Sequence, residues 1–187
     1  MTERFVIHET PLSALKIIER KVIEDSLGYL ERVFCADELG PLIGGRQIEQ
    51  ITHTMTSARG TVRGLHFQHP PHAELKFVSC LRGEVFDVAV DVRRGSPTFL
   101  HWHGEVLSDG NHRSMVIPEG FAHGFQSLDD ACELIYFHTA PHAPLAEGGL
   151  NPMDERLGIS WPEPVVGLSP RDAGQPPAAD NFRGVEL

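Results

Sequence analysis

One strongly alternating segment constrains the fold of this chain more than any other feature. In residues 85–92 (VFDVAVDV), the even-numbered residues are all apolar, whereas Asp87 and Asp91 fall on the opposite face. A repeat of two is the period of a β-strand with one buried face. Residues 76–81 (KFVSCL) precede this strand through the short glycine-containing connection 82–84, which is typical of a β-hairpin. The sequence therefore predicts an antiparallel pair of strands at the centre of the chain.

The rest of the chain has the same character, because short apolar stretches alternate with turn clusters of Gly, Pro, Asp, Asn and Ser. Short strands at this spacing predict an all-β fold, an antiparallel jelly roll, formed as a single domain by residues 1–187. The further expected strands are residues 5–8, 16–22, 48–55, 98–102, 114–117 and 133–139, and the expected short helical turns are residues 11–16, 36–39 and 154–157. Residues 173–187 are expected to be a C-terminal tail, either packed on the surface or mobile.

Charge and composition exclude several kinds of partner. The chain has 16 Lys and Arg against 26 Asp and Glu, a formal charge of −10, which disfavours binding to nucleic acid. No apolar run approaches the roughly 20 residues that span a bilayer, and the N-terminus lacks the pattern of a signal peptide, so no membrane partner is expected. The three cysteines have no paired spacing, which predicts reduced thiols and a cytoplasmic location.

The 11 histidines raise the question of a metal site. His101 and His103 have the i, i+2 spacing that places two imidazoles on one side of a strand. Glu105 is too close to them to complete the usual ligand pattern, and no other pairing is evident. We therefore expect surface or subunit-contact histidines and no metal.

Residues 60–68 (GTVRGLHFQ) carry Arg63 and His66 on an otherwise apolar stretch. A buried arginine needs an anion for its donors, and a diphosphate or a structural aspartate would both serve. Strict alternation places Arg63 and His66 on opposite faces of a strand. For both to reach one pocket the strand must bulge, and Gly64 is the residue where it could.

Five sequence blocks then point to a known family. They are residues 63–68 (RGLHFQ), 83–91 (GEVFDVAVD), 94–99 (RGSPTF), 117–125 (IPEGFAHGF) and 168–173 (LSPRDA). Together they resemble the dTDP-4-dehydrorhamnose 3,5-epimerase family, in its order and spacing. The resemblance implies a cupin double-stranded β-helix with a few short helices, a homodimer with residues 1–50 at the contact, and no cofactor. It also implies a nucleoside-diphosphate 4-keto-6-deoxy sugar as substrate, inverted at C3 and C5.

The resemblance also implies roles for individual residues. His66 takes the place of the base, Asp172 orients it, Tyr136 protonates the far face of the sugar, and Lys76 stabilises the enolate oxygen. An imidazole suits this role because its pKa lies near neutral pH, and a cation at the enolate oxygen lowers the barrier. The expected substrate-binding residues are Arg63, Gln50, Asp87, His123, Arg113, Arg171 and His142.

Three departures from the family pattern concern nucleotide recognition. Leu27 stands where the family has an arginine that reaches the neighbouring subunit's nucleotide, His142 where it has an aromatic residue, and Thr52 where it has an asparagine. The chemistry is expected to be retained, with either a different nucleotide sugar or a weaker grip on dTDP. Three alternatives remain open: a single-carbon epimerase, a metal-dependent cupin oxygenase or isomerase, and a non-catalytic cupin that binds nucleotide sugars.

Overall fold

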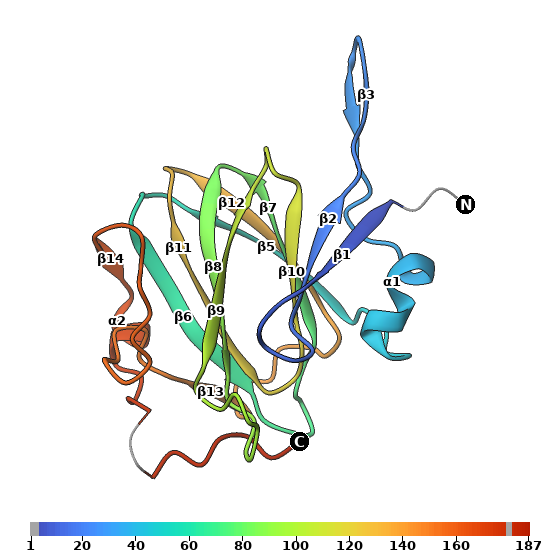
Figure 1. Ribbon diagram of the computed structural model, residues 1–187. Coiled ribbons are helices and arrows are strands. Elements are labelled where there is room, and N and C mark those ends of the chain that lie inside the picture. Colours follow the sequence, from blue (N-terminus) through green and yellow to red (C-terminus); the bar gives the residue numbers. More distant parts are fainter. Residues whose placement is uncertain (1–3, 179–180) are drawn as a thin grey trace.

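Two β-sheets that face each other form the body of this computed structural model, which describes residues 4–178 and 181–187 (Figure 1). The elements in chain order are β1 (Phe5–Glu9), β2 (Lys16–Arg20), β3 (Ile23–Asp25), β4 (Gly28–Leu30), α1 (Ala36–Ile43), β5 (Gln50–Thr56), β6 (Thr61–Gln68), β7 (Lys76–Arg82), β8 (Glu84–Asp91), β9 (Trp102–Ser108), β10 (Arg113–Ile117), β11 (Phe121–Ser127), β12 (Cys132–His138), β13 (Glu147–Gly149), β14 (Gly167–Leu168) and α2 (Pro170–Ala173). The first sheet has the order β1-β2-β10-β7-β12-β5. The second has the order β13-β6-β11-β8-β9, with β14 beside β6.

The pairing of these strands confirms the predicted jelly roll. Among the described strands, the neighbours in both sheets are antiparallel except for the short β14, which runs parallel to β6. Both strands of the predicted central hairpin are present as β7 and β8, but the prediction that they pair is wrong: β7 pairs with β10 and β12 in one sheet, and β8 pairs with β11 and β9 in the other. An apolar core lies between the sheets, with Val78 and Leu134 from one side and Val85 and Phe125 from the other. The functional cavity described below adjoins this core.

Strand β8 is buried on both faces, so the expectation of a half-buried strand is wrong. Val88 and Val90 pack outward against a second apolar cluster that includes Val185, because the C-terminal part of the chain covers this face. The opposite face carries Asp87 and Asp91, both fully buried. Each of these aspartates is hydrogen-bonded, which is the condition for burying a charged group.

The C-terminal tail packs against the barrel and so takes the first of its two expected forms. Ala178 and Val185 are both about 1% exposed, and the Val185 amide donates to the carbonyl of Val92 at 2.6 Å. The ring of Phe182 stacks on Phe99, with centroids 6.0 Å apart. The packed part of the tail thus completes the apolar cluster outside β8.

Some expected elements differ from the observed ones. Residues 98–100 form turns instead of a strand, and the strand there begins only at Trp102. The Asp91 carboxylate accepts hydrogen bonds from the hydroxyls of Ser96 and Thr98, and these bonds hold the chain in a compact loop. Side-chain bonding of this kind competes with strand formation, which explains why β propensity failed there.

Of the three short helical turns expected from the sequence, one is a helix in the structure. Residues 11–16 contain turns and the start of β2, and residues 155–157 form turns rather than a helix. Helix α1 is present and longer than expected. Its buried residues Leu39 and Ile43 pack against the outer face of the first sheet, in a cluster with Phe77. Burial of this face stabilises the short helix more than its own propensity does.

The hairpin of β3 and β4 projects away from the body of the protein (Figure 1). Its base is anchored by Arg20, whose Nε donates to Glu31 Oε2 at 2.8 Å, and by His112 Nδ1, 3.0 Å from the same oxygen. At its turn, the side chain of Leu27 is 95% exposed. The residue in place of the family arginine therefore lies on a protrusion, outside the barrel of its own chain.

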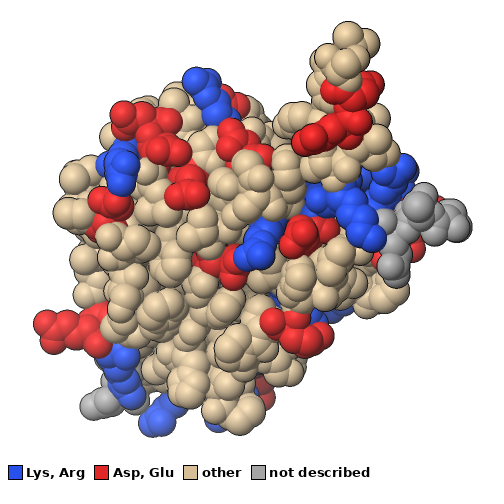
Figure 2. Space-filling view, turned by 45° about the horizontal axis from the view of Figure 1, so that its top comes forward, with Lys and Arg blue, Asp and Glu red and all other residues tan. Residues whose placement is uncertain are grey.

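The surface carries acidic and basic side chains interspersed, as one face in Figure 2 shows. Most of the basic groups on the described surface have an acidic neighbour, such as Arg82 beside Glu133 and Arg94 beside Glu186. Among the described residues, no helix has the length and apolar character needed to cross a membrane.

Candidate active site

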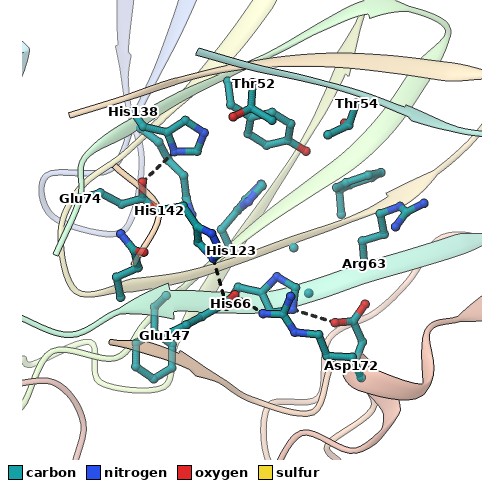
Figure 3. A pocket seen from close by; sticks show the side chains of 18 of the residues that line it. Thr52, Thr54, Arg63, His66, Glu74, His123, His138, His142, Glu147 and Asp172 are labelled. Atoms are coloured by element: carbon teal, nitrogen blue, oxygen red, sulfur yellow. Dashed lines mark hydrogen bonds and ion pairs between the residues drawn. The ribbon is translucent and has the colours of Figure 1, made fainter. Parts of the chain in front are cut away.

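A cavity of about 870 Å³ opens between the two sheets. The first sheet contributes side chains from β5, β7 and β12, and the second contributes β6 and β11, with α2 at one side. Figure 3 shows His66, Arg63 and Asp172 on one wall, and His138, Thr52 and Thr54 on the other. A ligand in the cavity would therefore have groups from both sheets on either side of it.

His66 and Asp172 are brought together although 106 residues separate them in the chain. His66 Nε2 lies 2.7 Å from Asp172 Oδ1, and Asp172 is 3% exposed. The short helix α2 fixes the aspartate, because the Asp172 amide donates to Ser169 Oγ at the helix N-cap. Burial lowers the pKa of His66, and the charge of Asp172 opposes this shift. The imidazole is therefore neutral near pH 7, with Nε2 donating to the carboxylate and Nδ1 free to accept a proton.

A bulge at Gly64 lets Arg63 and His66 reach the same cavity. His123 pairs with His66 and Phe125 pairs with Arg63, so β6 uses one more residue than β11 over this stretch. Gly64 has a φ of +108°, and a Cβ there would lie 2.6 Å from the Cα of Gly124. The expected bulge is confirmed, and only glycine fits it.

Tyr136 lies on the wall opposite His66, because β12 belongs to the first sheet. It is 9% exposed, and burial raises its pKa, with the nearby charge of Asp87 adding to the shift. The phenol is therefore protonated at neutral pH. His123 Nε2 lies 2.7 Å from Asp87 Oδ1, and its ring meets that of Tyr136 edge-on at 6.0 Å. Asp87 therefore does not line the cavity itself, but it holds His123, which does.

Lys76 lines the cavity together with Glu74 and His138, two residues that sequence analysis did not assign to the site. Its Nζ lies 3.2 Å from Glu74 Oε1, and the other oxygen of Glu74 lies 2.7 Å from His138 Nδ1. Burial alone would raise the pKa of Glu74, but the charges and hydrogen bonds of Lys76 and His138 outweigh it and hold that pKa at about 2. Glu74 and His138 are separated by 64 residues, and no spacing in the sequence signals their pairing.

A second cluster of polar side chains lines the cavity. Its members come from β5, from the loop after β12, from β13 and from α2. Gln50 Oε1 accepts a hydrogen bond from the His142 amide at 3.0 Å. Glu147, which sequence analysis missed, lies 3.3 Å from His142 Nε2 and forms an ion pair with Arg171. Gln50, His142 and Arg171 therefore line the cavity together, and their role in substrate binding stays a prediction.

Like Asp87, Arg113 is an expected site residue that does not line the cavity. It lies on β10 and its guanidinium is 2.6 Å from Glu105 Oε1, while the residues that line the cavity do not include it. Arg63 does line the cavity, with its Nε donating to Thr56 Oγ1 at 3.0 Å. The correction follows from topology, because β10 lies beyond β7 and away from the cavity wall that β12 and β5 form.

The histidine pair considered for metal does not form a ligand set. His101 precedes β9, and His103 Nε2 lies 3.7 Å from Glu105. Within the described ranges, no group of three or more His, Cys, Asp or Glu side chains is arranged to hold a metal ion.

A jelly roll in which a His–Asp pair faces a protonated tyrosine across a cavity indicates a cupin-type carbohydrate epimerase. Residues 9–180 match the family model described as dTDP-4-dehydrorhamnose 3,5-epimerase, and the chain belongs to that family. The enzyme of that name from Salmonella typhimurium is 40% identical over 172 residues, covering 91% of this chain and 94% of its own.

Solved structures agree with this assignment. The dTDP-6-deoxy-D-glucose-3,5-epimerase from Legionella pneumophila, solved in complex with dTDP-4-keto-L-rhamnose, is 39% identical, covers 98% of both chains and superposes with a TM-score of 0.90. A 4-keto-6-deoxy sugar epimerase from the novobiocin gene cluster of Streptomyces spheroides is 33% identical, with a TM-score of 0.91 over 98% of this chain and 94% of its own.

Proposed function

We propose that the protein inverts a nucleoside-diphosphate 4-keto-6-deoxy sugar at C3 and C5, converting dTDP-4-dehydro-6-deoxyglucose to dTDP-4-dehydrorhamnose. The observation that carries this proposal is the pairing of His66 with Asp172 on one wall of the cavity and the protonated Tyr136 on the other. Inversion needs a base on one face of the sugar ring and a proton donor on the other. Family membership and the names of the relatives support the same reaction.

The proposed step begins when His66 Nδ1 removes the proton from a carbon beside the C4 ketone. The C–H electron pair moves into the ring and then to the C4 oxygen, where the Lys76 ammonium stabilises the enolate. Collapse of the enolate forms a new C–H bond with the proton of Tyr136 on the opposite face. Solvent then takes the proton from His66 and returns one to Tyr136, so no net proton is consumed.

Asp172 would support this step in two ways. Its carboxylate fixes the imidazole tautomer with the proton on Nε2, which leaves Nδ1 as the basic atom. It also stabilises the imidazolium that forms after proton removal. Arg63 and Arg171 are the proposed diphosphate ligands, since guanidinium groups bind phosphate in a bidentate manner.

The test of this proposal is product formation. The protein is incubated with dTDP-4-keto-6-deoxyglucose, and the sugar is followed by NMR for the appearance of dTDP-4-dehydrorhamnose. A parallel incubation uses the same ketosugar on UDP. Turnover of the dTDP sugar supports the proposal, whereas turnover of the UDP sugar alone would assign a different nucleotide to the site that contains Thr52 and His142. No turnover of either ketosugar would refute the catalytic reading.

We further propose that the protein is a homodimer, in a reducing cytoplasm. Apolar side chains are exposed on the β3–β4 hairpin, at Ile23, Leu27, Tyr29 and Leu30, and a second copy would cover them. The three cysteines are free thiols, which suits a reducing compartment. Light scattering at micromolar concentration tests the oligomer, with a mass near twice 20.7 kDa expected.

A further inference from the structure

A row of three side chains crosses the first sheet at one end of the cavity. His138 on β12 is directly opposite Lys76 on β7 and, on its other side, directly opposite Gln50 on β5. Residues that are directly opposite in neighbouring strands present their side chains on the same face. All three line the cavity, so His138 lies between two residues already expected to act on the substrate.

Glu74 fixes the orientation of the His138 ring. The Glu74 carboxylate is 10% exposed, and its two oxygens are divided between Lys76 and His138. Figure 3 shows the contact with His138. An ionised carboxylate only accepts hydrogen bonds, so His138 Nδ1 carries the proton in the 2.7 Å contact. In the neutral imidazole this leaves a lone pair on Nε2.

His138 Nε2 is buried and finds no partner in the part of the chain that the structure describes. A buried polar atom without a hydrogen bond costs free energy unless a ligand supplies the missing group. The ring also stacks on that of Tyr136, with centroids 5.9 Å apart and planes 18° from parallel, so the two side chains are neighbours in the cavity wall. In the neutral form of the ring, this atom is therefore a hydrogen-bond acceptor that faces the reaction cavity.

We infer that His138, positioned by Glu74, is a specificity-determining residue that accepts a hydrogen bond from the C2 hydroxyl of the sugar. This inference rests on the proposed function. A 4-keto-6-deoxy sugar carries ring hydroxyls only at C2 and C3, and the C3 hydroxyl changes its position when C3 is inverted. Only the C2 hydroxyl can stay bound to a fixed acceptor throughout the reaction. Lys76, beside His138, is a donor and serves the ketone oxygen, so the two neighbours have complementary tasks.

The test compares binding of two stable probes, dTDP-glucose and its 2-deoxy analogue, by titration calorimetry at pH 8. The wild-type protein is expected to prefer the hydroxylated probe by about three- to tenfold, the value of one hydrogen bond. In His138→Phe, which keeps a ring against Tyr136, the preference is expected to fall below about twofold. His53→Phe is the matched control, because His53 forms an equivalent pair with Glu133 at 3.1 Å outside the cavity.

Two results would overturn the inference: equal binding of the probes by the wild type, or a preference that survives in His138→Phe. Glu74→Gln is a second variant, should His138→Phe fail to fold. It is expected to reduce the preference because the amide no longer fixes the tautomer, whereas an unchanged preference would remove Glu74 from its positioning role. Turnover of the ketosugar by the wild type, measured separately, distinguishes a failure of this inference from a failure of the proposed function.

Discussion

Replacement of Asp172 by asparagine tests the proposed base most sharply, because it changes charge with almost no change in shape. The carboxylate lies 2.7 Å from His66 Nε2 and is 3% exposed, so solvent does not replace it readily. A charge-assisted hydrogen bond of this kind contributes about 1.5–3 kcal/mol, which corresponds to roughly 10- to 150-fold in rate if it is made to the imidazolium. An asparagine that turns its NH₂ toward the ring also forces the proton onto Nδ1, the proposed basic atom. The combined loss in kcat is expected to be on the order of 10²- to 10⁴-fold.

The pH dependence of this variant has a definite sign. His66 must be neutral to act as a base, so the rate rises with pH through the pKa of His66. Burial lowers that pKa and the charge of Asp172 opposes the shift. Loss of the charge lowers the pKa further, and the acidic limb of the rate profile is expected to move to lower pH.

The assay is the exchange of the C3 and C5 protons of dTDP-4-keto-6-deoxyglucose with solvent deuterium, measured by NMR between pH 5 and 9. Asp109→Asn is the control, since Asp109 lies outside the cavity and contacts the Gly83 amide. A variant at position 172 with a rate within twofold of wild type, or an acidic limb displaced to higher pH, would refute the reasoning.

Three further predictions concern the proton donor, the bulge and acid stability. Tyr136→Phe is expected to lose product formation by about 10²-fold or more while exchange at the first carbon persists, as NMR of the sugar would show; equal losses of both would contradict its role. Gly64→Ala is expected to destabilise the fold by about 2–5 kcal/mol in chemical denaturation, because its Cβ would lie 2.6 Å from Gly124 Cα; a loss below 1 kcal/mol would argue against the bulge. Asp91 has a pKa of about 2, because hydrogen bonds from Arg93, Ser96 and Thr98 outweigh the effect of burial. The stability that this carboxylate gives to the folded protein is therefore present above the ordinary pKa of an aspartate and is lost as pH falls toward 2. Asp91→Asn should accordingly flatten the dependence of the melting temperature on pH between about 5 and 2, and an unchanged slope would contradict this.

Much of the fold could be predicted because strand periodicity survives in a single sequence. Strands β1, β2, β5, β7, β8, β10 and β12 fall close to the expected ranges, and the sandwich follows from their spacing. Long-range side-chain bonding could not be predicted. The turns at residues 98–100 depend on Asp91, and burial of both faces of β8 depends on residues near the C-terminus, such as Val185.

The residues of the site also divide into those that the sequence indicated and those that it did not. The resemblance indicated His66, Asp172, Tyr136 and Lys76, and the cavity brings all four together; their roles stay predictions. Glu74, His138 and Glu147 were missed, because each gains its place through a partner distant in the chain and none belongs to a recognisable block. Arg113 was assigned because it lies near the position of a family cation, and the strand order places it away from the cavity.

The central claim is that His66 removes protons from both carbons beside the ketone. Its most direct test is incubation of wild-type protein, His66→Ala and the control His69→Ala with dTDP-4-keto-6-deoxyglucose in heavy water. The account predicts deuterium at C3 and C5 with wild type and with the control, and at neither carbon with His66→Ala. Exchange by His66→Ala at the wild-type rate would contradict the assignment of the base, and a C5 position that stays silent with wild type would contradict the double inversion.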